Sequence, residues 1–281
     1  MPFLSTKITL LSLYILTFFV IQNTFVACQD FKPERVHLVD SYQGNYLFRG
    51  NEPIIGGKTF AYAELKEAMI KILQDYQFEV PTTFQLIDLN FLNGFTNEEY
   101  GNIKAEENWF KDYSQSQNFF HWPIYGSVTN PEMYTEDVRT EKALTFDNWD
   151  GDRITPRLKI TYDLLHKVET LPKFIYFHCE AGLDRTGEFA GCYKMLHFGW
   201  DYQQVIKYDT EIAGRKMVIF NSNHLQWYCY YLKENLNMNI SFKGLFSYLG
   251  FVPYSKEWLE THKSILKLKH LYKKFVRKSK R

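Results

Sequence analysis

Cys179 and Arg185 lie six positions apart in the segment 178–187, where the residue types could carry out chemistry. The apolar run 174–177 precedes the cysteine, and a helical pattern follows the arginine. A tight loop between a strand and a helix N-terminus turns backbone N–H groups toward an anion and favours the thiolate form of a cysteine. The guanidinium of an arginine can bind two phosphate oxygens at once. The segment therefore predicts a cysteine nucleophile that attacks phosphorus.

The anion-binding loop (residues 179–185) needs a strand before it and a helix after it. Apolar runs bounded by turn residues predict strands, and apolar residues at helical spacing predict helices. The predicted strands are 35–40, 45–49, 83–89, 118–124 and 174–177, and the predicted helices are 60–76, 157–168, 186–197, 202–212 and 222–236. This alternation predicts an α/β fold with a central, mostly parallel sheet flanked by helices. Pro123 restricts its strand to a sheet edge or a strand end.

Residues 31–240 are expected to form one folded domain, because a chain with 45% hydrophobic residues can bury a large core. Residues 1–28 are predicted to be a signal peptide, since Lys7 is followed by the apolar run 8–20 and by small residues near position 27. The alternative is an uncleaved signal anchor, because the apolar run approaches the length that spans a bilayer. Both interpretations place the protein in the secretory pathway, either secreted or membrane-anchored.

The C-terminal extension (residues 241–281) differs in charge from the rest of the chain. Nine lysines and arginines and no acidic residue lie between 263 and 281, and apolar residues recur at helical spacing from 265. This basic amphipathic helix could bind an anionic membrane surface, or it could pack its apolar side on the domain. We expect no nucleic-acid partner.

The chain has four cysteines, and removal of the signal peptide would remove Cys28. The remaining three have spacings that indicate no disulfide framework. Cys192 and Cys229 fall within apolar helical patterns and are expected to be buried. In an oxidising compartment Cys179 must stay reduced to act as a nucleophile.

His178, Cys179, Arg185 and Thr186 stand in the order His-Cys, five residues, Arg-Thr, and a glycine follows. This order closely resembles the motif of the cysteine-dependent phosphatases, the protein-tyrosine and dual-specificity superfamily. The resemblance extends more loosely over residues 46–232. It implies a protein-tyrosine-phosphatase-like α/β fold.

The resemblance also implies a reaction through a phosphocysteine intermediate. The Cys179 thiolate would attack the phosphate while the Arg185 guanidinium binds its oxygens. Thr186 would ease the departure of the sulfur, and His178 would orient the loop. The backbone N–H groups expected to bind the substrate with Arg185 include those of Glu180, Ala181, Gly182 and Leu183. The resemblance implies no metal and no cofactor.

The leaving oxygen needs a carboxylic acid that protonates it, and two sources of this acid remain open. In most relatives the acid comes from an upstream loop, often four residues before a proline, and Asp152 has that spacing to Pro156. Asp147 and Asp150 are neighbouring alternatives. The other source is Asp184, inside the anion-binding loop. Myotubularins and one group of bacterial secreted tyrosine or lipid phosphatases carry an aspartate at that position.

Glu180 and Leu183 stand where relatives that act on polyphosphorylated inositol lipids tend to carry lysine. An acidic loop repels a substrate with several phosphates. The expected substrates are therefore a phosphorylated protein, through phosphotyrosine or with dual specificity, or a small phosphomonoester. Two alternatives stay open: a phosphoinositide phosphatase, and a catalytically inactive phosphatase-like module that binds phosphorylated ligands.

Overall fold

The computed structural model describes residues 30–113, 117–245 and 256. The predicted signal segment and the predicted basic amphipathic helix therefore lie outside the described residues. Among the residues that are described, no helix combines the length and the apolar character needed to cross a membrane.

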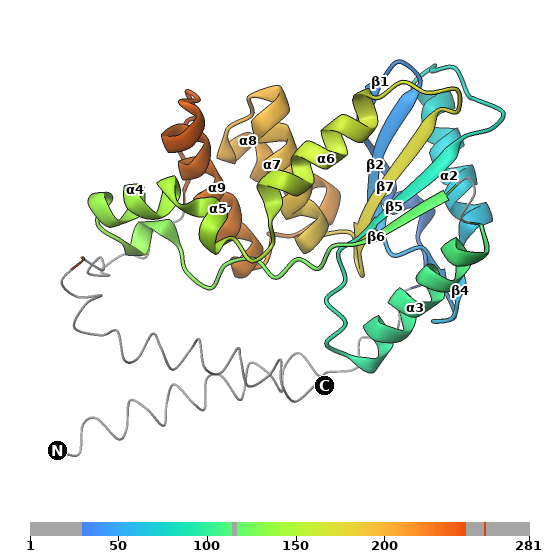
Figure 1. Cartoon of the computed structure of the whole chain (residues 1–281), viewed down its shortest axis with the longest axis horizontal. Coiled ribbons are helices and arrows are strands. Elements are labelled where there is room, and N and C mark those ends of the chain that lie inside the picture. Colours follow the sequence, from blue (N-terminus) through green and yellow to red (C-terminus); the bar gives the residue numbers. More distant parts are fainter. Residues whose placement is uncertain (1–29, 114–116, 246–255, 257–281) are drawn as a thin grey trace.

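A five-stranded sheet forms the centre of the fold (Figure 1). Its strands are, in spatial order, β1 (His37–Tyr42), β2 (Asn45–Asn51), β7 (Lys173–Cys179), β5 (Gln85–Asn90) and β6 (Gln117–His121). β1 pairs antiparallel with β2, and the other neighbours pair in parallel. The prediction of an α/β fold with a mostly parallel sheet is thus confirmed. β6 lies at the edge of the sheet and ends before Pro123, as the missing N–H of a proline requires.

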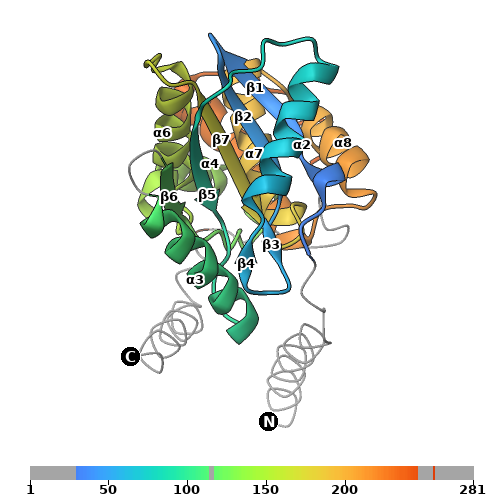
Figure 2. The same ribbon diagram turned by 90° about the vertical axis from the view of Figure 1, so that its right-hand side faces the viewer.

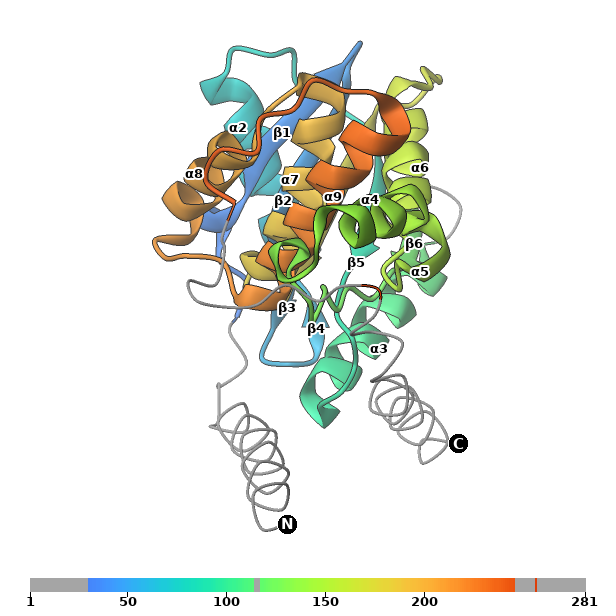
Figure 3. The same ribbon diagram turned by 90° about the vertical axis from the view of Figure 1, so that its left-hand side faces the viewer.

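Helices cover both faces of the sheet (Figure 2). One face carries α2 (Tyr62–Asp75) and α3 (Asn97–Asp112), beside a short hairpin of β3 (Ile54–Ile55) and β4 (Thr59–Phe60). The other face carries α6 (Ile154–His166), α7 (Asp184–Phe198), α8 (Tyr202–Ala213) and α9 (Ile219–Leu236). α4 (Glu136–Leu144) and α5 (Phe146–Trp149) lie against α9 (Figure 3). The 3-10 helices η1 (Pro33–Arg35) and η2 (Pro131–Met133) complete the described elements.

β7 is apolar along most of its length because both of its faces are buried. Side chains alternate between the faces of a strand, so this strand contributes to two cores. Phe174 and Tyr176 pack in the core beneath α2, whereas Ile175 and Phe177 pack in the core beneath α7. The Phe174 ring stacks on Phe84, with ring centroids 3.9 Å apart.

The start of α6 differs from the prediction. The helix begins at Ile154 rather than after Pro156, because a proline in the first turn needs no N–H partner. The Asp150 carboxylate accepts hydrogen bonds from the backbone N–H groups of Ile154 (2.6 Å) and Asp152 (2.8 Å). Asp150, and not Asp152, therefore binds the free N–H groups at this helix start.

We predict that Phe174→Ala lowers the free energy of unfolding by about 3–5 kcal/mol, because it leaves a cavity between the stacked rings. Chemical denaturation monitored by circular dichroism would measure the change. Tyr76→Ala is the matched control, since that ring is 64% exposed and its removal should cost little. Equal losses for the two variants would contradict the packing described for Phe174.

Candidate active site

The anion-binding loop starts where the parallel strands of the sheet end together. Cys179 is the last residue of β7, its side chain is 2% exposed, and its neighbour in register is Asn51 of β2. α7 begins at Asp184, after a turn of four residues. The structure therefore places the predicted nucleophile at the carboxyl end of the central strand, next to the N-terminus of a helix.

Gly182 allows the tight path of the loop. Its φ of +70° is strained for any residue with a Cβ, and an added Cβ would lie 2.4 Å from the carbonyl carbon of Gly50. The loop is also tied to the sheet, because the Glu52 N–H donates to the Glu180 carbonyl (3.3 Å). On the helix side, the Gly187 N–H donates to the Leu183 carbonyl (2.6 Å).

Arg185 is held in the loop by a carboxylate from another element. Its Nη1 lies 2.8 Å from Glu99 Oε1 of α3, and its Nη2 lies 3.7 Å from Glu180 Oε2. Burial opposes the charge, but Cys179, Glu99 and Glu180 together raise the pKa of Arg185 above its usual value. Glu99 was not predicted from the sequence. The pattern that could have indicated it is a helix start, with Thr96 three residues before Glu99. In the structure, Thr96 Oγ1 accepts a hydrogen bond from the Glu99 N–H.

Thr186 and Cys179, at the two ends of this loop, are both buried. The Thr186 side chain is fully buried, and its Oγ1 has no hydrogen-bond partner within the described part of the chain. A buried hydroxyl without a partner costs free energy, so such groups are often functional.

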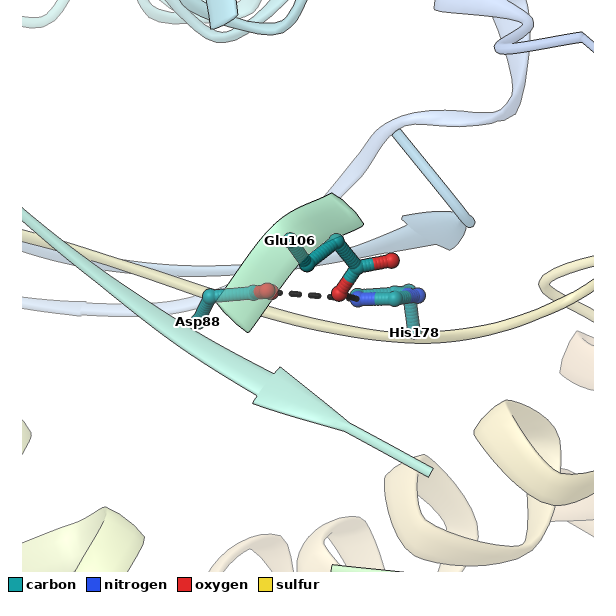
Figure 4. A group of neighbouring side chains, drawn as sticks. All are labelled: Asp88, Glu106 and His178. Atoms are coloured by element: carbon teal, nitrogen blue, oxygen red, sulfur yellow. Dashed lines mark ion pairs between the residues drawn. The ribbon is translucent and has the colours of Figure 1, made fainter. Parts of the chain in front are cut away.

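His178 faces the opposite side of the sheet from Cys179, as strand alternation requires. Figure 4 shows its ring beside Asp88 of β5 and Glu106 of α3. His178 Nε2 lies 3.2 Å from Asp88 Oδ1 and 3.3 Å from Glu106 Oε2, and all three side chains are buried. Burial lowers the pKa of His178, but the two carboxylates outweigh it and raise that pKa well above its usual value. The cluster thus favours an imidazolium directly before the nucleophile in the chain.

Glu52 extends this buried polar layer toward the end of β2. Its Oε2 accepts a hydrogen bond from Asn102 of α3 (3.1 Å). Burial and the charge of Glu106 raise the pKa of Glu52 to about 8. The layer therefore contains more carboxylates than positive groups, and burial favours a proton on at least one of them.

Two groups of side chains bring three possible metal-ligand atoms within 4.8 Å of one another: Asp88, Glu106 and His178, and Asp150, Asp152 and His224. Both groups consist of the carboxylates and imidazoles that bind transition metals. Several of their atoms already have polar partners. Asn90 donates to Glu106 (2.6 Å), and His224 bonds to Glu188 (2.5 Å). In the first group, however, Asp88 Oδ2 and His178 Nδ1 are buried without a hydrogen-bond partner among the described residues.

Asp152 is buried, with 2% exposure. Its two oxygens accept hydrogen bonds from the backbone N–H groups of Tyr125 (2.9 Å) and Gly126 (2.7 Å). Burial raises the pKa of Asp152, against the charge of His224. In this arrangement the carboxylate fixes the segment that follows β6.

Asp184 is the first residue of α7, and its side chain is 19% exposed. Arg215 donates to both of its oxygens, at 2.9 and 2.5 Å, and the Val218 N–H donates to one of them (2.8 Å). The ion pair raises the pKa of Arg215. The structure thus brings Asp184 to the surface beside the loop, where a second guanidinium holds it.

Exposed apolar side chains lie on the segments beside the loop. Phe95 and Tyr125, which follow β5 and β6, have ring centroids 5.6 Å apart and are 59% and 46% exposed. Val218 and Ile219 lie close to Asp184 and are each 42% exposed. An aromatic or apolar group could therefore bind beside the mouth of the site.

Comparison with known proteins gives local and distant similarities. No model of a known protein family matches the chain. The dual specificity protein phosphatase CDC14AB of Danio rerio is 38% identical over 80 residues, and CDC14B of Mus musculus is 38% identical over 72 residues. These segments cover 27% and 25% of this chain, but the chain spans only 13% and 14% of the lengths of these relatives. These local matches confirm the resemblance of this chain to the cysteine-dependent phosphatases.

Two solved structures illustrate the structural likeness. The kinase associated phosphatase is 15% identical with a TM-score of 0.35, and the alignment covers 75% of this chain and 98% of that chain. The core catalytic domain of the PP-IP phosphatase SIW14 from S. cerevisiae is 14% identical with a TM-score of 0.34, covering 75% and 92%. Likenesses at this level carry no argument about activity.

We predict that Glu52→Gln removes a loss of stability that the wild type shows at alkaline pH. The folded protein binds the Glu52 proton with a pKa of about 8, above the usual value for glutamate, so ionisation of Glu52 favours unfolding. This loss of stability is absent at pH values below the pKa that Glu52 has in the unfolded chain. It grows as the pH rises and reaches its full size above about pH 8, where Glu52 is ionised in the folded protein as well. The melting temperature of Glu52→Gln should exceed that of the wild type by at least about 3 °C at pH 9 and match it at pH 4.

The control for this experiment is Glu64→Gln, which removes an exposed carboxylate from α2. Its melting temperature should follow that of the wild type at both pH values. Equal melting temperatures of Glu52→Gln and the wild type at pH 9 would show that Glu52 is ionised without cost.

Proposed function

We propose that the protein is a phosphatase that hydrolyses phosphate monoesters through a phosphocysteine intermediate. The observation that carries this proposal is the placement of Cys179 at the end of a parallel strand, beside a helix N-terminus and within the electrostatic reach of Arg185. Loop amides, helix dipole and guanidinium all stabilise negative charge at this point. They would favour both the thiolate and the phosphoryl oxygens.

The reaction has two steps. In the first, the Cys179 sulfur forms a bond to phosphorus, the bond from phosphorus to the ester oxygen breaks, and that oxygen takes a proton from a carboxylic acid. In the second, the carboxylate left by the first step takes a proton from a water molecule as the water oxygen forms a bond to phosphorus; the bond from sulfur to phosphorus breaks, the sulfur leaves as thiolate, and phosphate is released. Thr186 is suited to donate a hydrogen bond to the departing sulfur, because its buried hydroxyl has no partner among the described residues.

Asp184 is the acid that the proposal favours. It is 19% exposed and directly precedes Arg185, whereas Asp152 is only 2% exposed. The oxygens of both carboxylates already accept hydrogen bonds, but those of Asp152 bind backbone N–H groups, whereas both oxygens of Asp184 bind the side chain of Arg215, which is 45% exposed. Arg215 must move away from Asp184 before this carboxyl group can act as the acid. Glu180 is a rival within the loop, since burial raises its pKa and its side chain is 32% exposed.

The proposed substrates carry one phosphate on an aromatic or apolar group, as phosphotyrosine does. Glu99 and Glu180 surround Arg185 with negative charge and would repel further phosphates. Phe95 and Tyr125 offer exposed rings to the leaving group. A secretory location and contact of the C-terminal tail with an anionic membrane are proposals that rest on the sequence alone.

A binding module without turnover is the second candidate. The observation that favours it is the ion pair of Asp184 with Arg215, in which the guanidinium occupies both oxygens of the carboxylate. Such a module would still bind phosphorylated ligands through the anion-binding loop.

We predict that the reduced, purified protein hydrolyses aryl phosphates and that Cys179→Ser lowers the rate by at least about a thousandfold while phosphate binding persists. Phosphate release and phosphate affinity would be measured on the same preparations. Cys192→Ala, which removes a buried thiol from α7, is the matched control and should retain turnover. No turnover by the reduced wild type between about pH 5 and 7, with phosphate still bound, would favour the binding module.

We predict that Asp184→Asn slows hydrolysis of alkyl or phenyl phosphates by about 100-fold and hardly affects activated nitrophenyl esters, because only poor leaving groups need a proton. Leaving-group dependence of kcat/KM would be measured for Asp184→Asn, Asp152→Asn and Glu180→Gln. A steeper dependence in Glu180→Gln or Asp152→Asn than in Asp184→Asn would assign the acid to that other residue.

A further inference from the structure

We propose that Arg35 and Arg49 are positioning residues, which turn the N–H groups of the anion-binding loop toward the substrate. The inference rests on the proposed function. Neither arginine belongs to the loop motif. They lie in η1 and β2, 146 and 133 residues away from the carbonyl groups that they bind.

Each arginine binds one carbonyl of the loop. Arg35 Nη1 donates a hydrogen bond to the Ala181 carbonyl (2.7 Å). Arg49 Nη2 donates to the Gly182 carbonyl (3.0 Å) and also lies 2.9 Å from Asp209 Oδ1 of α8. Arg49 is fully buried, and its ion pair with Asp209 is buried too. Transfer of a guanidinium from water to the protein interior costs much free energy, so the buried position of Arg49 under the loop needs an explanation.

The two arginines complete a set of four external hydrogen bonds. The carbonyls of residues 180–183 receive their hydrogen bonds, in chain order, from the Glu52 N–H, Arg35, Arg49 and the Gly187 N–H. In a trans peptide plane the carbonyl and the following N–H point in opposite directions. Holding these four carbonyls away from the site therefore turns the next four N–H groups toward it, where an anion would bind.

Gly187 makes room for this arrangement. A Cβ at this position would lie 2.2 Å from Asp209 Oδ1, so a larger residue would displace the partner of Arg49. Asp209 also neutralises the charge of Arg49. We infer that Arg49 acts mainly through the direction of its hydrogen bond. Arg35 lies at the surface side of the loop, is only partly buried, and is the residue better suited to mutation.

The test measures loop geometry without requiring turnover. Arg35→Ala should raise the pH at which Cys179 reaches half of its maximal rate of alkylation by iodoacetamide. In the Cys179→Ser background it should weaken inorganic phosphate binding by about tenfold, the usual worth of one charge-assisted hydrogen bond. In an active enzyme, kcat should fall by about 10- to 100-fold. Arg35→Lys should restore part of each loss, and Arg49→Lys should show the same direction of change.

The control is Arg139→Ala, which removes an arginine of α4 that pairs with Glu132 of η2. It should leave alkylation and phosphate affinity unchanged. If Arg35→Ala folds with the melting temperature of the wild type and keeps both its alkylation midpoint and its phosphate affinity within twofold, the positioning role is wrong. If both values shift as expected and the wild type shows no turnover, the positioning role stands and the proposed phosphatase activity fails.

Discussion

The direction of a few peptide planes is the constraint on which the rest of this structure depends. A loop that binds an anion must expose its N–H groups, so its carbonyl groups need partners elsewhere. The partners are Arg35 of η1, Arg49 of β2, the Glu52 N–H directly after β2, and the Gly187 N–H in the first turn of α7. The packing of β2 beside β7 and of α8 beside α7 brings these donors into place. The buried pair of Arg49 and Asp209 belongs to this requirement rather than to the stability of the core, since buried ion pairs seldom add stability.

The two faces of the sheet differ near the carboxyl ends of its parallel strands. Beneath α7 the face is apolar apart from the buried pair of Arg49 and Asp209, whereas beneath α3 it carries carboxylates, amides and an imidazole, all buried. His178 belongs to the polar face, although it precedes the nucleophile by one residue. Alternation along β7 thus connects a buried electrostatic layer to the loop.

Much of the fold could be predicted because its strands and most of its long helices carry regular apolar patterns. α3 has no such pattern, since Glu99, Asn102 and Glu106 are among its buried residues. A helix that buries polar side chains cannot be found by hydrophobic periodicity. α4 buries only Val138 and Ala143, and β3 and β4 are too short to show alternation.

The residues of the candidate site also include some that the sequence indicated and some that it did not. Local spacing indicated Cys179 and Arg185, which lie close together in sequence and in structure. Spacing to Pro156 also indicated Asp152, but its distant backbone partners at Tyr125 and Gly126 could not be read from the chain. Arg35, Arg49 and Glu99 were missed because their partners lie far away in sequence.

Residues 30–35 connect the entry of the described chain to the anion-binding loop. Lys32 and Asp30 are bonded to the end of β2, so the described chain enters the domain directly beside the anion-binding loop. Removal of residues 30–35 would therefore also remove the hydrogen bond from Arg35 to the loop, so a shortened version of this domain has to begin before Asp30 to keep the anion-binding loop as described.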